Sequence, residues 1–284
     1  MNELCRDRIT WYRAGLESPF PQGYAGSNPA RGGYFFREDY GTSIKDLYQE
    51  ERLPTMNKQN KEVLKTKFSR ICYNEGDNSI KKIVDAVKRA EQFNYRMFKI
   101  KPCEIQLNLV YSNKEYDKRT GLQKIENHYR GGYVDQNRII IISPKIKKSD
   151  YSLYAWFLHE YNHIFYKEVV KIDGPAWFGE GMATYLMKEY KFDKVAWKRY
   201  FKKMKNPEKF LFFRYIKRRH YKHMNEMFIL STLVYEYLHK KFGQKRILSF
   251  IRTFARNPTK EDFSRKFIRS FKKTEKEIVR TVIN

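Results

Sequence analysis

The stretch Leu158–Ile164 reads Leu-His-Glu-Tyr-Asn-His-Ile and places a His-Glu-x-x-His pattern inside an apolar segment of helical period. Residues four apart on a helix lie one above the other, so the imidazoles of His159 and His163 can reach a single ion. A catalytic zinc ion takes three protein ligands and leaves a fourth position to water. The pair therefore needs a third ligand from elsewhere in the chain.

Glu180 is the candidate for this third ligand. It follows His163 by 17 residues and lies in Gly174–Tyr185, where a turn-rich entry runs into a second helical pattern. A short helix–loop–helix can fold back and bring Glu180 opposite the two imidazoles. We predict one Zn²⁺ per chain, bound by His159, His163 and Glu180.

His-Glu-x-x-His followed by Trp-x-x-Glu-Gly-x-Ala-x-Tyr at Trp177–Tyr185 resembles the gluzincin metallopeptidases, most closely the group called peptidase MA-like. The resemblance extends from about Cys103 to the C-terminus. It implies the same three zinc ligands, with Glu160 as the catalytic carboxylate. It also implies an α+β, zincin-like fold, in which a small twisted β-sheet and an active-site helix are followed by a mainly α-helical C-terminal lobe.

The chemistry expected of such a site is peptide hydrolysis without a covalent intermediate. Two neutral imidazoles and one carboxylate leave a zinc site with a net charge of about +1, which favours ionisation of its water. Glu160 can take the proton as general base and return it to the leaving amine. Thr184, one turn beyond Glu180, is expected to hydrogen-bond the Glu180 carboxylate.

The donor for the developing oxyanion is not evident in the sequence. Gluzincins commonly use a Tyr or His from the helical lobe, but Phe228 stands where relatives often have a Tyr, and Phe cannot donate. The nearest alternatives are His220, Tyr221 and His223, in a basic run whose other interpretation is a solvated surface. We retain Tyr221 and His223 as candidate catalytic residues.

Periodicity predicts the elements around this motif. We expect helices within Ser43–Phe98, most clearly at Asn78–Phe98, and strands at Cys103–Tyr111 and Ile139–Ser143 with a turn at Gly131–Arg138 between them. The resemblance puts the strand Ile139–Ser143 at a sheet edge beside the cleft, whereas its isoleucine run equally suits a wholly buried strand. Ser149 and Asp150 are the expected caps of the zinc helix. Later helices are expected at Asn225–Phe242, Lys245–Phe254, Lys260–Phe271 and Glu275–Ile283.

These elements divide the chain into four parts. Residues 1–55, whose first 42 are rich in Pro and Gly, are predicted to form a flexible extension, and the true start of the protein stays open. We expect a helical N-terminal segment at 56–102, the zincin-like catalytic core at 103–190 and the helical C-terminal lobe at 191–284.

Composition limits the possible partners and the compartment. The formal charge is +26, from 58 Lys and Arg against 32 Asp and Glu, and is spread along nearly every segment. We therefore expect weak, non-specific binding to acidic partners or nucleic acid besides the peptide or protein substrate. Cys5, Cys72 and Cys103 are too few for a disulfide framework, and a reducing compartment fits best. No signal peptide or membrane span is evident, so a cytoplasmic protein is expected, and the oligomeric state stays unknown.

Two other functions remain open. A DNA-associated metalloprotease of the SprT kind would account for the charge, but that group shares only His-Glu-x-x-His and uses a third histidine, and the next one after His163 is His220. The other is a binding protein that kept a zincin fold without catalysis. Metal content separates this last reading from both peptidases.

Overall fold

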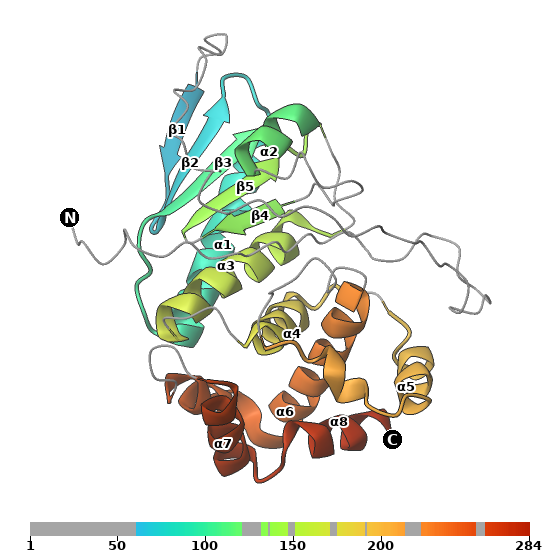
Figure 1. Cartoon of the computed structure of the whole chain (residues 1–284). Coiled ribbons are helices and arrows are strands. Elements are labelled where there is room, and N and C mark those ends of the chain that lie inside the picture. Colours follow the sequence, from blue (N-terminus) through green and yellow to red (C-terminus); the bar gives the residue numbers. More distant parts are fainter. Residues whose placement is uncertain are drawn as a thin grey trace, which may run out of the picture.

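The computed structural model describes residues 61–120, 132–135, 137–146, 151–170, 175–190, 192–213, 223–253 and 259–284. Within these ranges the protein is α+β. A five-stranded mixed sheet is built from the first part of the chain, and most of the remainder is helical. Figure 1 shows the sheet at one end of the molecule and the later helices gathered at the other, with α3 and α4 between them.

The sheet has the strand order β1-β2-β3-β5-β4. The central strands β2 (Ser69–Asn74), β3 (Ile105–Val110) and β5 (Arg138–Ile142) are parallel to one another. The outer strands β1 (Lys61–Lys65) and β4 (Gly132–Asp135) pair antiparallel with β2 and β5. Strands from both sides of Cys103 therefore belong to one sheet.

Two predictions about this sheet are wrong. The region expected to be helical before Asn78 contains β1 and β2, and alternate residues of β2 face inwards, with Ile71 fully buried. Of the two readings of Ile139–Ser143, the edge position is also wrong, because β5 lies between β3 and β4 and is buried from Ile139 onwards. The outer edge on this side of the sheet belongs to β4, within the segment expected to be a turn.

Helix α1 (Ile80–Phe98) confirms the clearest helical prediction. It connects the parallel strands β2 and β3 and packs its apolar stripe, which includes Ile83, Val87 and Ala90, into the main core. Its principal partner is α3 (Leu153–Val170). The short α2 (Asn113–Thr120) follows β3 and packs on β5. The helix that carries His-Glu-x-x-His therefore packs against α1.

The C-terminal part of the chain is helical, as predicted. Its elements are α4 (Ala176–Met187), α5 (Lys194–Lys202), the 3₁₀ turn η3 (Pro207–Phe210), α6 (Met224–Arg252), α7 (Lys260–Phe271) and α8 (Glu275–Ile283). The predicted stop at Gly243 is a kink within α6, where the residue has φ 75° and ψ 159°. Aromatic rings fill the space between α4, α6 and α7; Trp177 lies edge-on to Phe263 and Phe267.

Two expectations drawn from composition can be compared with the structure. None of the helices in the described ranges has both the length and the apolar character needed to cross a membrane. Cys72 is a free thiol.

Candidate metal centre

Helix α3 carries three of the predicted site residues. The helix begins after Ser152, whose Oγ accepts a hydrogen bond from Ala155 N at 3.1 Å; the expected caps Ser149 and Asp150 lie outside the described residues. The side chains along α3 are buried on nearly every face, because the helix lies between α1 and α4. His159, Glu160 and His163 are all fully buried, and ligand atoms of the three lie within 4.8 Å of one another.

Helix α4 brings Glu180 to the same point. Glu180 Oε2 lies 3.5 Å from His159 Nε2 and 3.4 Å from His163 Nε2, and the two Nε2 atoms are 2.9 Å apart. The Glu180 side chain is fully buried as well. The three predicted ligands, which come from two different helices, therefore converge through one atom each.

The spacing of these three atoms can be compared with the needs of zinc. A triangle with these sides has a circumscribed circle of about 1.9 Å radius, so a point just outside its plane lies about 2.0–2.1 Å from all three atoms. Zinc binds imidazole nitrogen and carboxylate oxygen at this distance, and two His with one Glu is a donor set of catalytic zinc sites. The residues present therefore fit a zinc ion.

The protonation states favour metal binding. Burial lowers the pKa of His159 to about 4, so its imidazole is neutral at pH 7, the form that binds a metal. For Glu180, burial alone would raise the carboxyl pKa, but the neighbouring His163 and His159 outweigh it and hold the pKa well below its usual value. Glu180 is therefore the ionised partner of the two imidazoles.

Glu160 lies beside these ligands, and its carboxyl group differs from that of Glu180 in its pKa. Burial, and then the charge of Glu180, raise the pKa of Glu160 well above its ordinary value. Neither of its carboxyl oxygens makes a hydrogen bond within the described part of the protein. A fully buried carboxyl group without a hydrogen-bond partner is costly to fold, and such groups are common where proton transfer is the task.

A polar network that the sequence did not reveal positions α3. Tyr161, between the two histidines, contacts Ser69 through their hydroxyls at 2.6 Å, and Ser69 Oγ donates to Glu91 Oε1 at 2.5 Å. Because the Ser69 proton goes to Glu91, the Tyr161 hydroxyl is the donor to Ser69. Glu91 also accepts from Thr66 Oγ1 and Phe68 N. Helix α3 is thereby joined to the start of β2 and to α1.

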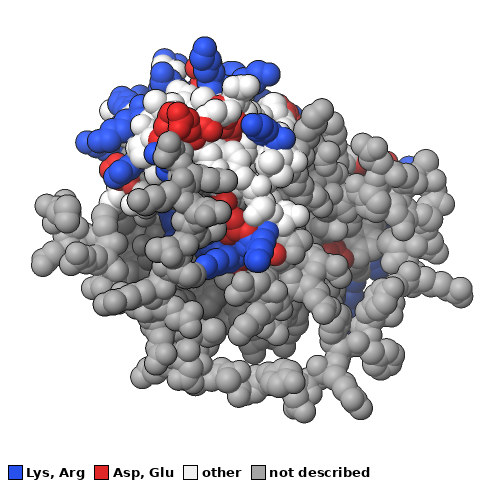
Figure 2. All heavy atoms as spheres, turned by 90° about the horizontal axis from the view of Figure 1, so that it is seen from above, with Lys and Arg blue, Asp and Glu red and all other residues white. Residues whose placement is uncertain are grey.

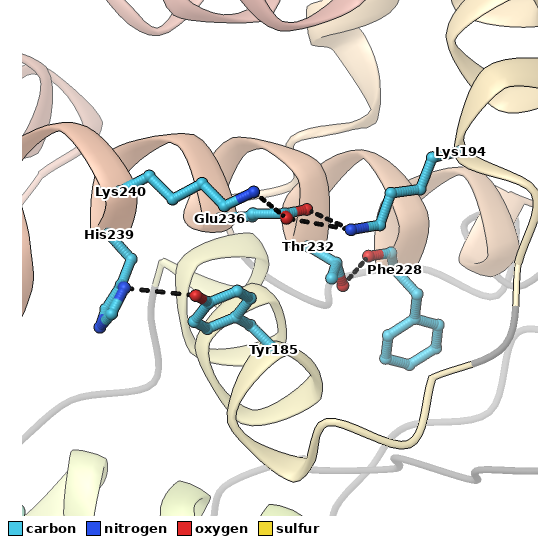
Figure 3. Close-up of polar contacts among 7 residues, drawn as sticks. All are labelled: Tyr185, Lys194, Phe228, Thr232, Glu236, His239 and Lys240. Atoms are coloured by element: carbon cyan, nitrogen blue, oxygen red, sulfur yellow. Dashed lines mark hydrogen bonds and ion pairs between the residues drawn. The ribbon is translucent and has the colours of Figure 1, made fainter.

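Helix α4 is held equally closely against α6. A Cβ at Gly181 would lie 2.4 Å from the main-chain oxygen of Ser231, so only glycine fits there. One turn further on, Figure 3 shows Tyr185 directed at His239, with 3.3 Å between the hydroxyl and Nδ1. On α6, Glu236 accepts hydrogen bonds from Lys194, at the start of α5. The contacts of Gly181 and Tyr185 hold α4, which carries Glu180, against α6.

Within the described ranges, the structure does not show side-chain hydrogen bonds between the remaining predicted residues and the three candidate ligands. Thr184 is buried, but its Oγ1 makes no hydrogen bond to Glu180 or to any other described group. His223 lies at the start of α6, where its ring contacts Phe210 and its Nδ1 is 3.6 Å from Glu226. Tyr221 and His220 lie outside the described residues. Phe228 is buried on α6.

Comparison with known proteins adds no family: no family model matches this chain, and no curated protein sequence matches it.

Proposed function

We propose that this chain is a zinc-dependent metallopeptidase of the gluzincin type, which hydrolyses peptide bonds in a peptide or protein substrate. The observation that carries the proposal is the position of Glu180 Oε2, 3.5 Å and 3.4 Å from the Nε2 atoms of His159 and His163. A zincin-like arrangement of the α+β fold is part of the same proposal. The helix order supports it, because α3 with His-Glu-x-x-His is followed directly by α4 with the third ligand.

The proposed reaction uses His159, His163 and Glu180 to hold the ion and Glu160 to move the proton. A bound zinc ion would supply a Lewis acid that polarises the scissile carbonyl and lowers the pKa of water. Glu160, next to His159 on the helix, takes the proton of the attacking water and then passes it to the leaving amine.

Burial sets one condition on this reaction. Because His159, Glu160, His163 and Glu180 are fully buried, a substrate reaches Glu160 only after the chain around the site opens. Extended or unstructured segments reach a buried site more readily than folded ones. We therefore expect cleavage of unstructured protein before cleavage of folded protein.

The competing interpretation is a buried, hydrogen-bonded His-His-Glu cluster in a binding protein without catalysis. Such a binding protein would have the same geometry as the peptidase and would differ from it in activity. The test therefore replaces only Glu160, the residue that moves the proton. Glu160→Gln keeps the size of the side chain and removes the basic oxygen. We expect casein cleavage to fall by at least about a hundredfold, with the zinc content unchanged.

The measurement compares casein cleavage, zinc content and melting temperature of wild type and Glu160→Gln in one buffer. Glu104→Gln, an exposed carboxylate before β3, is the matched control and should cleave like wild type. Undiminished cleavage by Glu160→Gln with zinc bound would mean that another group activates the water. A folded wild-type protein that binds no zinc and cleaves no unstructured substrate would favour the binding protein.

A further inference from the structure

Six basic side chains lie within twelve residues along α5, the turn that follows it and η3. They are Lys198, Arg199, Lys202, Lys203, Lys205 and Lys209, and all but the half-buried Lys198 are exposed. We call this set the α5–η3 surface. Figure 1 shows α5 on the outer side of the C-terminal lobe, away from the sheet.

The acidic residues near the α5–η3 surface are already engaged. Glu208, the one acid within these twelve residues, faces Lys276 at 3.6 Å. Asp193 caps α5 by accepting from Val195 N and Ala196 N. Across the described ranges, none of the six basic side chains of this surface forms an ion pair with an acid. Their positive charge is therefore not compensated within the described structure.

Some basic residues elsewhere are paired with acids. On α6, Glu236 pairs with both Lys194 and Lys240, as Figure 3 shows. On α7, Asp262 pairs with both Arg265 and Lys266. The face drawn in Figure 2 has acidic side chains among its Lys and Arg side chains. The formal charge of the chain is spread widely, and the α5–η3 surface brings six basic side chains without an ion pair in the described ranges together within twelve residues.

We propose that the α5–η3 surface binds the phosphate backbone of nucleic acid without reading its sequence. Cations one turn apart on a helix, such as Arg199 with Lys202 and Lys203, form a closely spaced row. Such a row matches the regular, dense negative charge of a nucleic acid, which carries one charge per about 1.7 Å of duplex axis.

The kind of basic residue and the orientation of α5 define this partner further. Five of the six are Lys, which binds phosphate as a point charge and lacks the planar fork with which Arg reads guanine. The apolar side of α5, with Trp197, Tyr200 and Phe201, packs into the protein core. These apolar side chains are therefore not available to insert into a membrane.

The test measures binding of the full-length protein to fluorescent 20-nucleotide single strands and 20-base-pair duplexes of two unrelated sequences, by anisotropy. Lys202→Gln, Lys203→Gln and Lys205→Gln are combined in one variant. The control combines Lys81→Gln, Lys82→Gln and Lys88→Gln on the exposed face of α1, which removes the same charge. Circular dichroism and melting temperature confirm that both variants are folded.

We expect the wild type to bind both sequences equally, with affinity falling steeply between about 50 and 300 mM salt. The α5–η3 variant should bind at least about tenfold more weakly at about 100 mM salt. Its slope of log affinity against log salt should be shallower by about 2–3, since three phosphate contacts are lost at about 0.9 each. The control should stay within about twofold of wild type.

Three results would overturn the proposal. Equal losses in both variants would mean that binding follows total charge and has no defined surface. A preference of more than about tenfold for one sequence at equal length would mean direct base readout. Absence of nucleic-acid binding at about 50 mM salt, with binding to phosphatidylserine vesicles or an acidic protein, would identify another partner.

Discussion

Gly181 approaches the main chain of Ser231 so closely that a Cβ on Gly181 would lie 2.4 Å from the Ser231 carbonyl oxygen and 2.7 Å from its carbonyl carbon. Both groups are main-chain atoms in helices, and neither can turn aside as a flexible side chain can. The contact fixes the spacing of α4 and α6 at the residue directly after Glu180. The glycine of Glu-Gly-x-Ala is therefore a requirement of packing next to the proposed zinc ligand.

Gly181→Ala should accordingly separate α4 from α6. We expect a loss of about 1–3 kcal/mol in the free energy of unfolding, the usual effect of overpacking a core, and weaker zinc binding because Glu180 moves with the helix. Urea unfolding and zinc titration measure the two effects. Adding Ser231→Gly should give no rescue, because the clash involves the main chain. A variant with wild-type stability and zinc affinity would show that the helices adjust freely.

Asp77 is predicted to stabilise the junction of β2, β3 and β5. Its carboxylate accepts from Tyr111 Oη and Ser143 Oγ, both at 2.8 Å, and from Ser79 N at 2.9 Å. Asp77→Asn replaces one acceptor oxygen by an amide and removes the charge. We expect it to cost about 1–3 kcal/mol at pH 7, and Asp85→Asn, an exposed control on α1, to cost little.

The pH dependence of this effect follows from the pKa of Asp77. Burial pushes the pKa up, but hydrogen bonds from Ser79 and Ser143 outweigh it and leave the pKa below its usual value of 3.8. An acid with a lowered pKa in the folded state contributes stability above the unfolded pKa and loses it as pH falls through the folded pKa. The stability gap between wild type and Asp77→Asn should therefore narrow below about pH 4. A gap that stays constant down to pH 2 would contradict this.

Three helices end on a lysine in the left-handed conformation. Lys99, Lys188 and Lys272 have φ of 56°, 59° and 57° and follow α1, α4 and α7. Glycine adopts this conformation without the steric cost of a Cβ. Lys272→Gly should raise the free energy of unfolding by about 0.5–1 kcal/mol, whereas Lys272→Ala, which keeps the Cβ, should give no gain. Thermal unfolding of wild type and the two variants measures this difference. Equal stability of Lys272→Gly and Lys272→Ala would mean that the left-handed residue is not strained.

The sequence predicted well the elements whose periodicity is unbroken. The apolar stripe of α1 and the alternation of β3 were read at the right places, and the spacing from His163 to Glu180 predicted that the two would meet. These signals are local, because helix and strand periods are set by the backbone alone.

The prediction of secondary structure and packing failed where a residue is required by a contact with a residue distant in the sequence. In β2 the inward positions are Ser69, Ile71 and Tyr73, and the polar Ser69 conceals the alternation because it is buried to bind Glu91 and Tyr161. Strand β1 is exposed throughout and carries no apolar period. The need for glycine at Gly181 also depends on α6, about 50 residues further on, so no local pattern reveals it.

The most direct test of the central claim is the zinc content of the purified protein, measured by elemental analysis for wild type, Glu180→Gln and the control Glu104→Gln. A site made by His159, His163 and Glu180 predicts about one zinc per chain in wild type and in the control. It predicts a large loss in Glu180→Gln at equal free zinc, because a neutral amide replaces the anionic ligand. Full zinc occupancy in folded Glu180→Gln, or no zinc in folded wild type supplied with the metal, would contradict the metal centre.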